Sequence, residues 1–212
     1  MYNLSNIQPA KSITHYKQLQ TGDIIAVSGT AWLSKRIQDF QLLVDPESGK
    51  MNHSGLIFMD DDIWVFEADI VEGYKIKAAV KPTLLFKYLV SESELFIFRF
   101  KNTYSKKAIK RYMFKYMAVP YEYHNLLGDQ IILKLSQWIG KKIGKPDFEI
   151  WLGRKNRTTK RLICHEYAQL VWHEFKGIFP DHRKGKISTV VHHPDFEMYE
   201  VDKKAVLQSL TE

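Results

Sequence analysis

The chain has 212 residues, a length that suits one domain, and 45% of them are hydrophobic, 13% aromatic and 26% charged. This composition excludes disordered, collagen-like and membrane-embedded proteins. The formal net charge is +7 at pH 7, and the single cysteine excludes both an intramolecular disulfide and a cysteine-rich zinc module.

Short runs of β-branched and aromatic residues, bounded by turn residues, occupy the first half of the chain. They predict strands at residues 22–27, 54–59, 63–66, 74–79 and 95–100. Apolar residues at three- and four-residue spacing predict helices at residues 32–44, 106–118, 126–139 and 164–175. Strands followed mostly by helices indicate an α+β fold, with a largely antiparallel sheet packed against helices.

No internal repeat, low-complexity stretch or long linker rich in proline and glycine divides the chain. We therefore expect one domain over residues 1–212, with a core at about 21–176 and a C-terminal extension at 177–212. Residues 141–161 lack periodicity and are expected to form a long surface loop before the last predicted helix.

Positive charge is concentrated in residues 101–161, which hold 15 lysines and arginines against 4 acidic residues. This excess would suit an anionic surface such as a membrane or a cell-wall polymer, but it also fits the solvated face of lysine-rich helices. Aromatic residues alternate with charges at 111–116, a spacing that also suits one buried helix face, so we expect no nucleic acid partner.

Targeting signals are not recognisable in the sequence. Residues 1–19 show no basic run followed by an apolar stretch and a cleavage site, and no run of about 18 apolar residues occurs anywhere. The default expectation is a cytoplasmic location, with export by a route that needs no N-terminal signal left open.

The single cysteine, Cys164, begins the last predicted helix. Ala168, Val171, Trp172 and Phe175 continue an apolar stripe from it, so its side chain is expected to point inward toward the sheet. A thiol at a helix N-terminus meets the positive end of the helix dipole, which favours the nucleophilic thiolate. The alternative is an inert buried cysteine, because free cysteines are among the most buried residues.

A cysteine nucleophile needs a base, and His53 is the candidate because it stands at the start of a predicted strand. The acidic turn at 60–62 joins that strand to the next, and a three-residue loop pairs Gly55 with Glu67. His53 then lies diagonal to Glu67 on one face, at roughly 7–8 Å between the backbones, whereas an even-membered loop would put Glu67 on the other face. A carboxylate there can orient the imidazole, with Asp69 as the backup. The alternatives are a structural histidine and a solvated glutamate at a strand end.

The remaining histidines do not predict a metal site. His165 and His173 lie eight residues apart on the predicted helix and His192 and His193 lie in the tail, without the close ligand pairs that zinc sites show. No phosphate-binding GxxxxGKS/T or dinucleotide-binding GxGxxG motif occurs either. We therefore expect neither a metal nor a cofactor.

Five short motifs, in a fixed order, resemble those of one known family. They are Thr21-Gly22-Asp23-Ile24-Ile25, Asn52-His53-Ser54-Gly55-Leu56, Val65-Phe66-Glu67-Ala68, Pro120-Tyr121-Glu122-Tyr123 and Ile163-Cys164-His165-Glu166. With these motifs the sequence resembles the circularly permuted branch of the NlpC-type papain-like hydrolases. The most similar group is the YiiX/YebB-like proteins, relatives of the lecithin:retinol acyltransferase family, and the resemblance spans residues 21–175.

The resemblance implies a permuted papain-like fold with Cys164 as nucleophile, His53 as base and Glu67 as the third, polar residue. It implies a cysteine hydrolase of the amidase or peptidase type that acts on an amide or ester through an acyl-enzyme, for example on cell-wall peptide. The alternatives are a lipid acyl hydrolase or acyltransferase at membrane surfaces and a non-enzymatic module that binds polyanions. The sequence departs from the family at His165 and Glu166, where members often carry Ser-Glu, and the backbone N–H of Cys164 is the one oxyanion donor that can be assigned.

Overall fold

The strands that the computed structural model describes form one seven-stranded sheet in the order β1-β7-β6-β2-β3-β4-β5. The structure describes residues 11–30, 38, 51–71, 77–117, 119, 142, 164–180 and 188–211. The strands are β1 (Lys11–Ile13), β2 (Ile24–Ser28), β3 (His53–Met59), β4 (Ile63–Val71), β5 (Lys77–Leu84), β6 (Glu94–Phe100) and β7 (Phe196–Val201). The helices are α2 (Leu85–Leu89), α3 (Lys106–Lys115), α5 (Cys164–Lys176), α6 (Ser188–Val191) and α7 (Lys203–Ser209), with a short 3-10 helix at Tyr16–Gln18.

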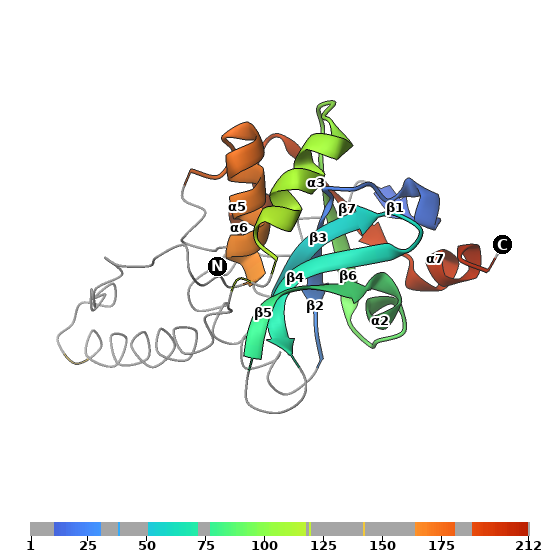
Figure 1. Cartoon of the computed structure of the whole chain (residues 1–212). Coiled ribbons are helices and arrows are strands. Elements are labelled where there is room, and N and C mark those ends of the chain that lie inside the picture. The colour runs from blue at the N-terminus through green and yellow to red at the C-terminus, as the bar shows by residue number, and fades with distance from the viewer. Residues whose placement is uncertain are drawn as a thin grey trace.

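The sheet is mixed: β1 pairs with β7 in parallel, and the other neighbouring strands pair antiparallel. The predicted α+β class and the largely antiparallel sheet are confirmed, with one parallel pair at the edge of the sheet. In that pair, β7 lies beside β6, and β1, from the other end of the chain, lies on the outer side of β7 (Figure 1).

Most of the predicted elements that fall on described residues are confirmed. The predicted helices at 106–118 and 164–175 are α3 and α5, and four predicted strands are β2, β3, β4 and β6. The fifth, 74–79, is described only from Lys77, and β5 continues to Leu84 through Lys81 and Pro82 because an edge strand tolerates charge and proline. The predicted helices at 32–44 and 126–139 and the loop at 141–161 lie, apart from single residues, outside the described part of the chain.

Helices cover both faces of the sheet, with α3 and α5 on one side and α2 and α7 on the other (Figure 1). Along β2, Ile24 and Ala26 belong to the core under α3 and α5, whereas Ile25 and Val27 belong to the core under α2 and α7. A strand buried on both faces is expected to be apolar without alternation. This explains the continuous apolar run of β2.

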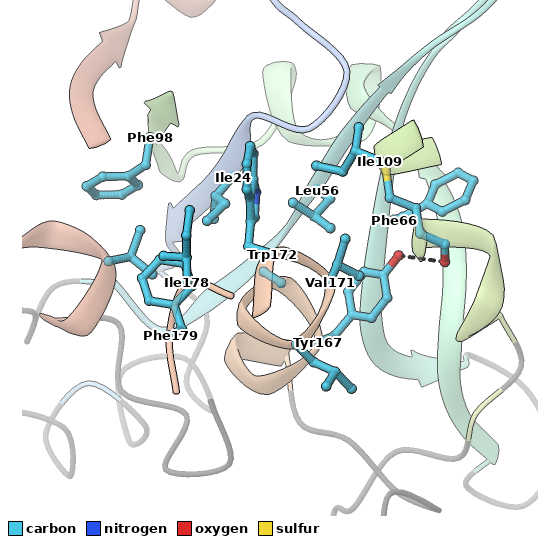
Figure 2. Close-up of a cluster of buried hydrophobic side chains, with 14 of the residues drawn as sticks. Ile24, Leu56, Phe66, Phe98, Ile109, Tyr167, Val171, Trp172, Ile178 and Phe179 are labelled. Atoms are coloured by element: carbon cyan, nitrogen blue, oxygen red, sulfur yellow. Dashed lines mark hydrogen bonds between the residues drawn. The ribbon is translucent and has the colours of Figure 1, made fainter. Parts of the chain in front are cut away.

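Helix α5 is buried along most of its length, as its apolar stripe predicts. Trp172 and Tyr167 are fully buried and lie in the close-packed cluster of Figure 2. The indole Nε1 of Trp172 donates to the Gly22 carbonyl oxygen at 3.0 Å, and the Tyr167 hydroxyl donates to the Met113 carbonyl oxygen at 3.1 Å. Gly22 has φ of +99°, and a Cβ there would lie 2.9 Å from Cδ1 of Ile109, so only glycine fits beneath these helices.

Within the described residues, no helix combines the length and the apolar character that crossing a membrane requires.

Candidate active site

The β3–β4 hairpin has the predicted register. Met59 pairs with Ile63, and Gly55 pairs with Glu67, around the three-residue acidic turn. The Nε2 atom of His53 lies 2.5 Å from Oε2 of Glu67, so the two side chains meet on one face as the alternation of strand residues requires. A Cβ on Gly55 would lie 3.1 Å from Cβ of Glu67, so the glycine leaves space for the carboxylate to reach His53.

Glu67 is a buried carboxylate with a full set of donors. Its side chain is 0% exposed, so the alternative of a solvated strand end is wrong. Oε1 accepts a hydrogen bond from Oγ1 of Thr83 at 2.5 Å, and Oε2 accepts one from the Tyr88 hydroxyl. Asp69, the backup for this role, pairs instead with Lys81 at 3.3 Å.

The surroundings of His53 and Glu67 hold both groups in their charged forms. Burial acts against the carboxylate, but His53, Thr83 and Tyr88 outweigh it and lower the pKa of Glu67 to about 2. Burial also acts against the imidazolium, but Glu67 and Cys164 outweigh it and raise the pKa of His53 well above its ordinary value. The two residues therefore form an ion pair at neutral pH.

Cys164 begins α5 and contacts the other side of this pair. It is 6% exposed, and it lies close enough to the His53 ring to contribute to the raised pKa of that ring. The structure thus brings together all three residues that the sequence singles out, in the chain of contacts Cys164–His53–Glu67. A cysteine beside a charged imidazole is compatible with a cysteine hydrolase, because an imidazolium stabilises a thiolate.

Two of the histidines considered as metal ligands contact other groups. Nδ1 of His173 lies 3.2 Å from the carbonyl oxygen of Ile178, and Nδ1 of His193 lies 3.9 Å from Oδ2 of Asp195. Over the described ranges, no three histidine, cysteine or acidic side chains come together in a way that could hold a metal ion.

Comparisons with known proteins find matches among solved structures. No family model matches the sequence, and no curated protein does. Among solved structures, the chain is similar to the crystal structure of the metalloprotein yiiX from Escherichia coli O157:H7. The similarity covers 90% of this chain and 92% of that chain, with 18% sequence identity and a TM-score of 0.48.

The sequence pattern does not reveal two residues of the site, Thr83 and Tyr88. Thr83 follows Lys81, the partner of Glu67 across the β4–β5 ladder, by two positions and therefore lies on the face of Glu67. The predicted strand stopped at residue 79, so this alternation could not be followed to Thr83. Tyr88 lies on α2, a five-residue helix too short to show a periodic pattern.

The Tyr88 hydroxyl should contribute strongly to stability because it donates to a buried charge. We expect Tyr88→Phe to lower the free energy of unfolding by about 1.5–3 kcal/mol, the range for hydrogen bonds to charged groups. Urea denaturation at neutral pH measures this loss. Tyr116→Phe is the matched control, because the Tyr116 hydroxyl donates to Glu174, whose side chain is 25% exposed and can bind water instead. Equal losses in the two variants would contradict the role assigned to Tyr88.

Proposed function

We propose that the protein is a cysteine hydrolase of the amidase or peptidase type, with Cys164 as nucleophile, His53 as base and Glu67 as the residue that orients His53. The observation that carries the proposal is the contact of the Cys164 side chain with an imidazole that a buried carboxylate holds in the charged form. The order of these residues in the sequence and the family resemblance support the same assignment.

The proposed reaction proceeds through a thioester. As an imidazolium, His53 carries the proton taken from the Cys164 thiol, the Cys164 thiolate attacks the acyl carbon, and the backbone N–H of Cys164 donates to the oxyanion. His53 then gives the proton to the departing amine or alcohol, and the thioester remains. Water attacks the thioester and gives a proton to the now neutral His53, which releases the acid and restores the thiolate beside the imidazolium. Glu67 stays ionised throughout and stabilises the imidazolium.

Exposed apolar side chains on and just after the helix that carries Tyr88 favour a second candidate function, the hydrolysis or transfer of a lipid acyl group. Phe86 and Val90 are 56% and 57% exposed, and they lie on or just after α2, the helix whose Tyr88 binds Glu67. An apolar surface there would suit an acyl chain or a membrane surface. The basic segment 101–161, proposed to face an anionic membrane or cell-wall polymer, is described only at 101–117, 119 and 142.

Acylation by an activated ester tests the proposal. Incubation with p-nitrophenyl acetate should release a burst of about one equivalent of p-nitrophenolate and leave one acetyl group on Cys164, seen by mass spectrometry of the intact protein and its peptides. Cys164→Ser controls for acetylation of lysines. The same burst in Cys164→Ser would overturn the proposal. Faster reaction with longer acyl chains would favour the lipid candidate, and cleavage of peptide amides would favour the amidase.

A further inference from the structure

We propose that Ser54 and His165 form a positioning pair that fixes Cys164 relative to His53, an inference that rests on the proposed function. Ser54 directly follows His53 in the chain, and His165 directly follows Cys164. Oγ of Ser54 lies 2.7 Å from Nδ1 of His165, so one hydrogen bond joins the immediate neighbours of the two reacting residues across 111 positions of sequence.

The geometry of β3 and α5 places this hydrogen bond beside the reacting groups rather than between them. Because side chains alternate along a strand, Ser54 points away from the face of His53 and toward α5, as Leu56 does. Leu56 lies beside Val171 of α5 in Figure 2. On the helix, His165 is turned by about 100° from Cys164. The hydrogen bond between Ser54 and His165 therefore constrains the backbone next to both reacting residues. It does not lie between the side chains of Cys164 and His53.

Burial makes the contact between the pair difficult to break. Ser54 is 0% exposed and His165 is 3% exposed. When a buried hydroxyl or ring nitrogen loses its hydrogen-bond partner, no water molecule can replace that partner, and the folded state is destabilised. The Ser54–His165 hydrogen bond thus holds the first turn of α5 against the start of β3.

Other hydrogen bonds tie α5 to the rest of the chain further along the helix. They involve Tyr167, Trp172 and Glu174, which lie three, eight and ten positions after Cys164. The Ser54–His165 bond acts one position after the nucleophile. A displacement of about 1 Å at a reacting group can cost about 10²-fold in rate, so a hydrogen bond this close to the nucleophile is expected to influence the position of the sulfur strongly.

Alkylation of Cys164 by iodoacetamide, measured from about pH 5 to pH 10, tests the pair through the thiolate and without any acyl substrate. The wild-type protein should alkylate at Cys164, whose side chain contacts the His53 ring. Ser54→Ala and His165→Ala should each lower the alkylation rate at neutral pH by about 10-fold, and the double variant should lower it no further, because both act through one bond. His165→Asn, whose amide can replace Nδ1, should restore most of the rate.

Controls separate positioning from stability and from the proposed function. Ser209→Ala removes a buried hydroxyl that donates to the Val206 carbonyl oxygen far from Cys164 in the sequence, and it should leave the alkylation profile unchanged. A wild-type profile in Ser54→Ala, or fully additive losses in the double variant, would overturn the positioning pair and leave the proposed function standing. A wild-type protein that is not alkylated at Cys164 would overturn the proposed function, and the pair with it.

Discussion

Replacing His53 with alanine is expected to slow the acylation of Cys164 by about 10²–10⁴-fold, the range for the loss of a general base. The reason is that the ring both accepts the thiol proton and, as an imidazolium held by Glu67, stabilises the thiolate. The measurement is the rate constant of the p-nitrophenolate burst, with protein in excess over ester so that a single acylation is observed.

The variant His53→Gln separates the chemical role of the ring from its structural one. Its amide can still donate to Glu67, but it cannot take a proton at neutral pH. We expect it to lose acylation to the same extent as His53→Ala while its free energy of unfolding stays closer to that of the wild type. An active His53→Gln protein would show that His53 is a structural residue, the alternative considered from the sequence.

The sequence predicts those parts of the site that depend on short-range pairing. The acidic turn 60–62 fixes the loop length, the loop fixes the register, and the register places His53 and Glu67 on one face. The apolar stripe of the last helix likewise predicts that Cys164 starts a helix packed against the sheet, and α5 begins there. In both cases, the periodicity of a single element or of a single hairpin carries the information.

The parts that the sequence does not predict depend on contacts between distant segments. Tyr88 reaches Glu67 from a five-residue helix, and Ser54 reaches His165 across 111 positions. In strand β7 the two acidic residues, Glu197 and Glu200, lie three positions apart, which is not the period-2 pattern of a half-buried strand. Its pairing with β6 joins segments that are about 100 positions apart in the sequence. A single sequence contains no direct signal for such pairings.

The site joins the two faces of the sheet, which explains why it needs supports from both. Glu67 and Tyr88 meet on the side of α2, whereas Cys164 belongs to α5 on the opposite side. His53 is the first residue of β3, and from that strand end its ring contacts both Glu67 and Cys164. A displacement of the helices on either face of the sheet would therefore change the position of Cys164 relative to the His53 ring.

Replacing Glu67 with glutamine should make stability less dependent on pH on the alkaline side. The pKa of His53 is raised above its ordinary value of 6.5, so its charge contributes stability that is complete below about pH 6.5 and is lost as the pH rises through the folded value. The pKa of Glu67 is lowered from 4.5 to about 2, so its contribution is complete above about pH 4.5 and is lost as the pH falls toward 2. Both contributions are complete only between these limits.

The difference in free energy of unfolding between the wild type and Glu67→Gln should therefore be largest near pH 5.5, at about 1.5–3 kcal/mol, and smaller near pH 9.5, because the stability that the imidazolium contributes is lost as the pH rises through the folded pKa of His53. Urea denaturation at the two pH values measures it. Asp69→Asn is the matched control, because Asp69 is 32% exposed and pairs with a surface lysine, so its loss should stay within about 1 kcal/mol at both pH values. An equal difference at both pH values for Glu67→Gln would show that Glu67 contributes through packing alone and does not hold His53 in its charged form.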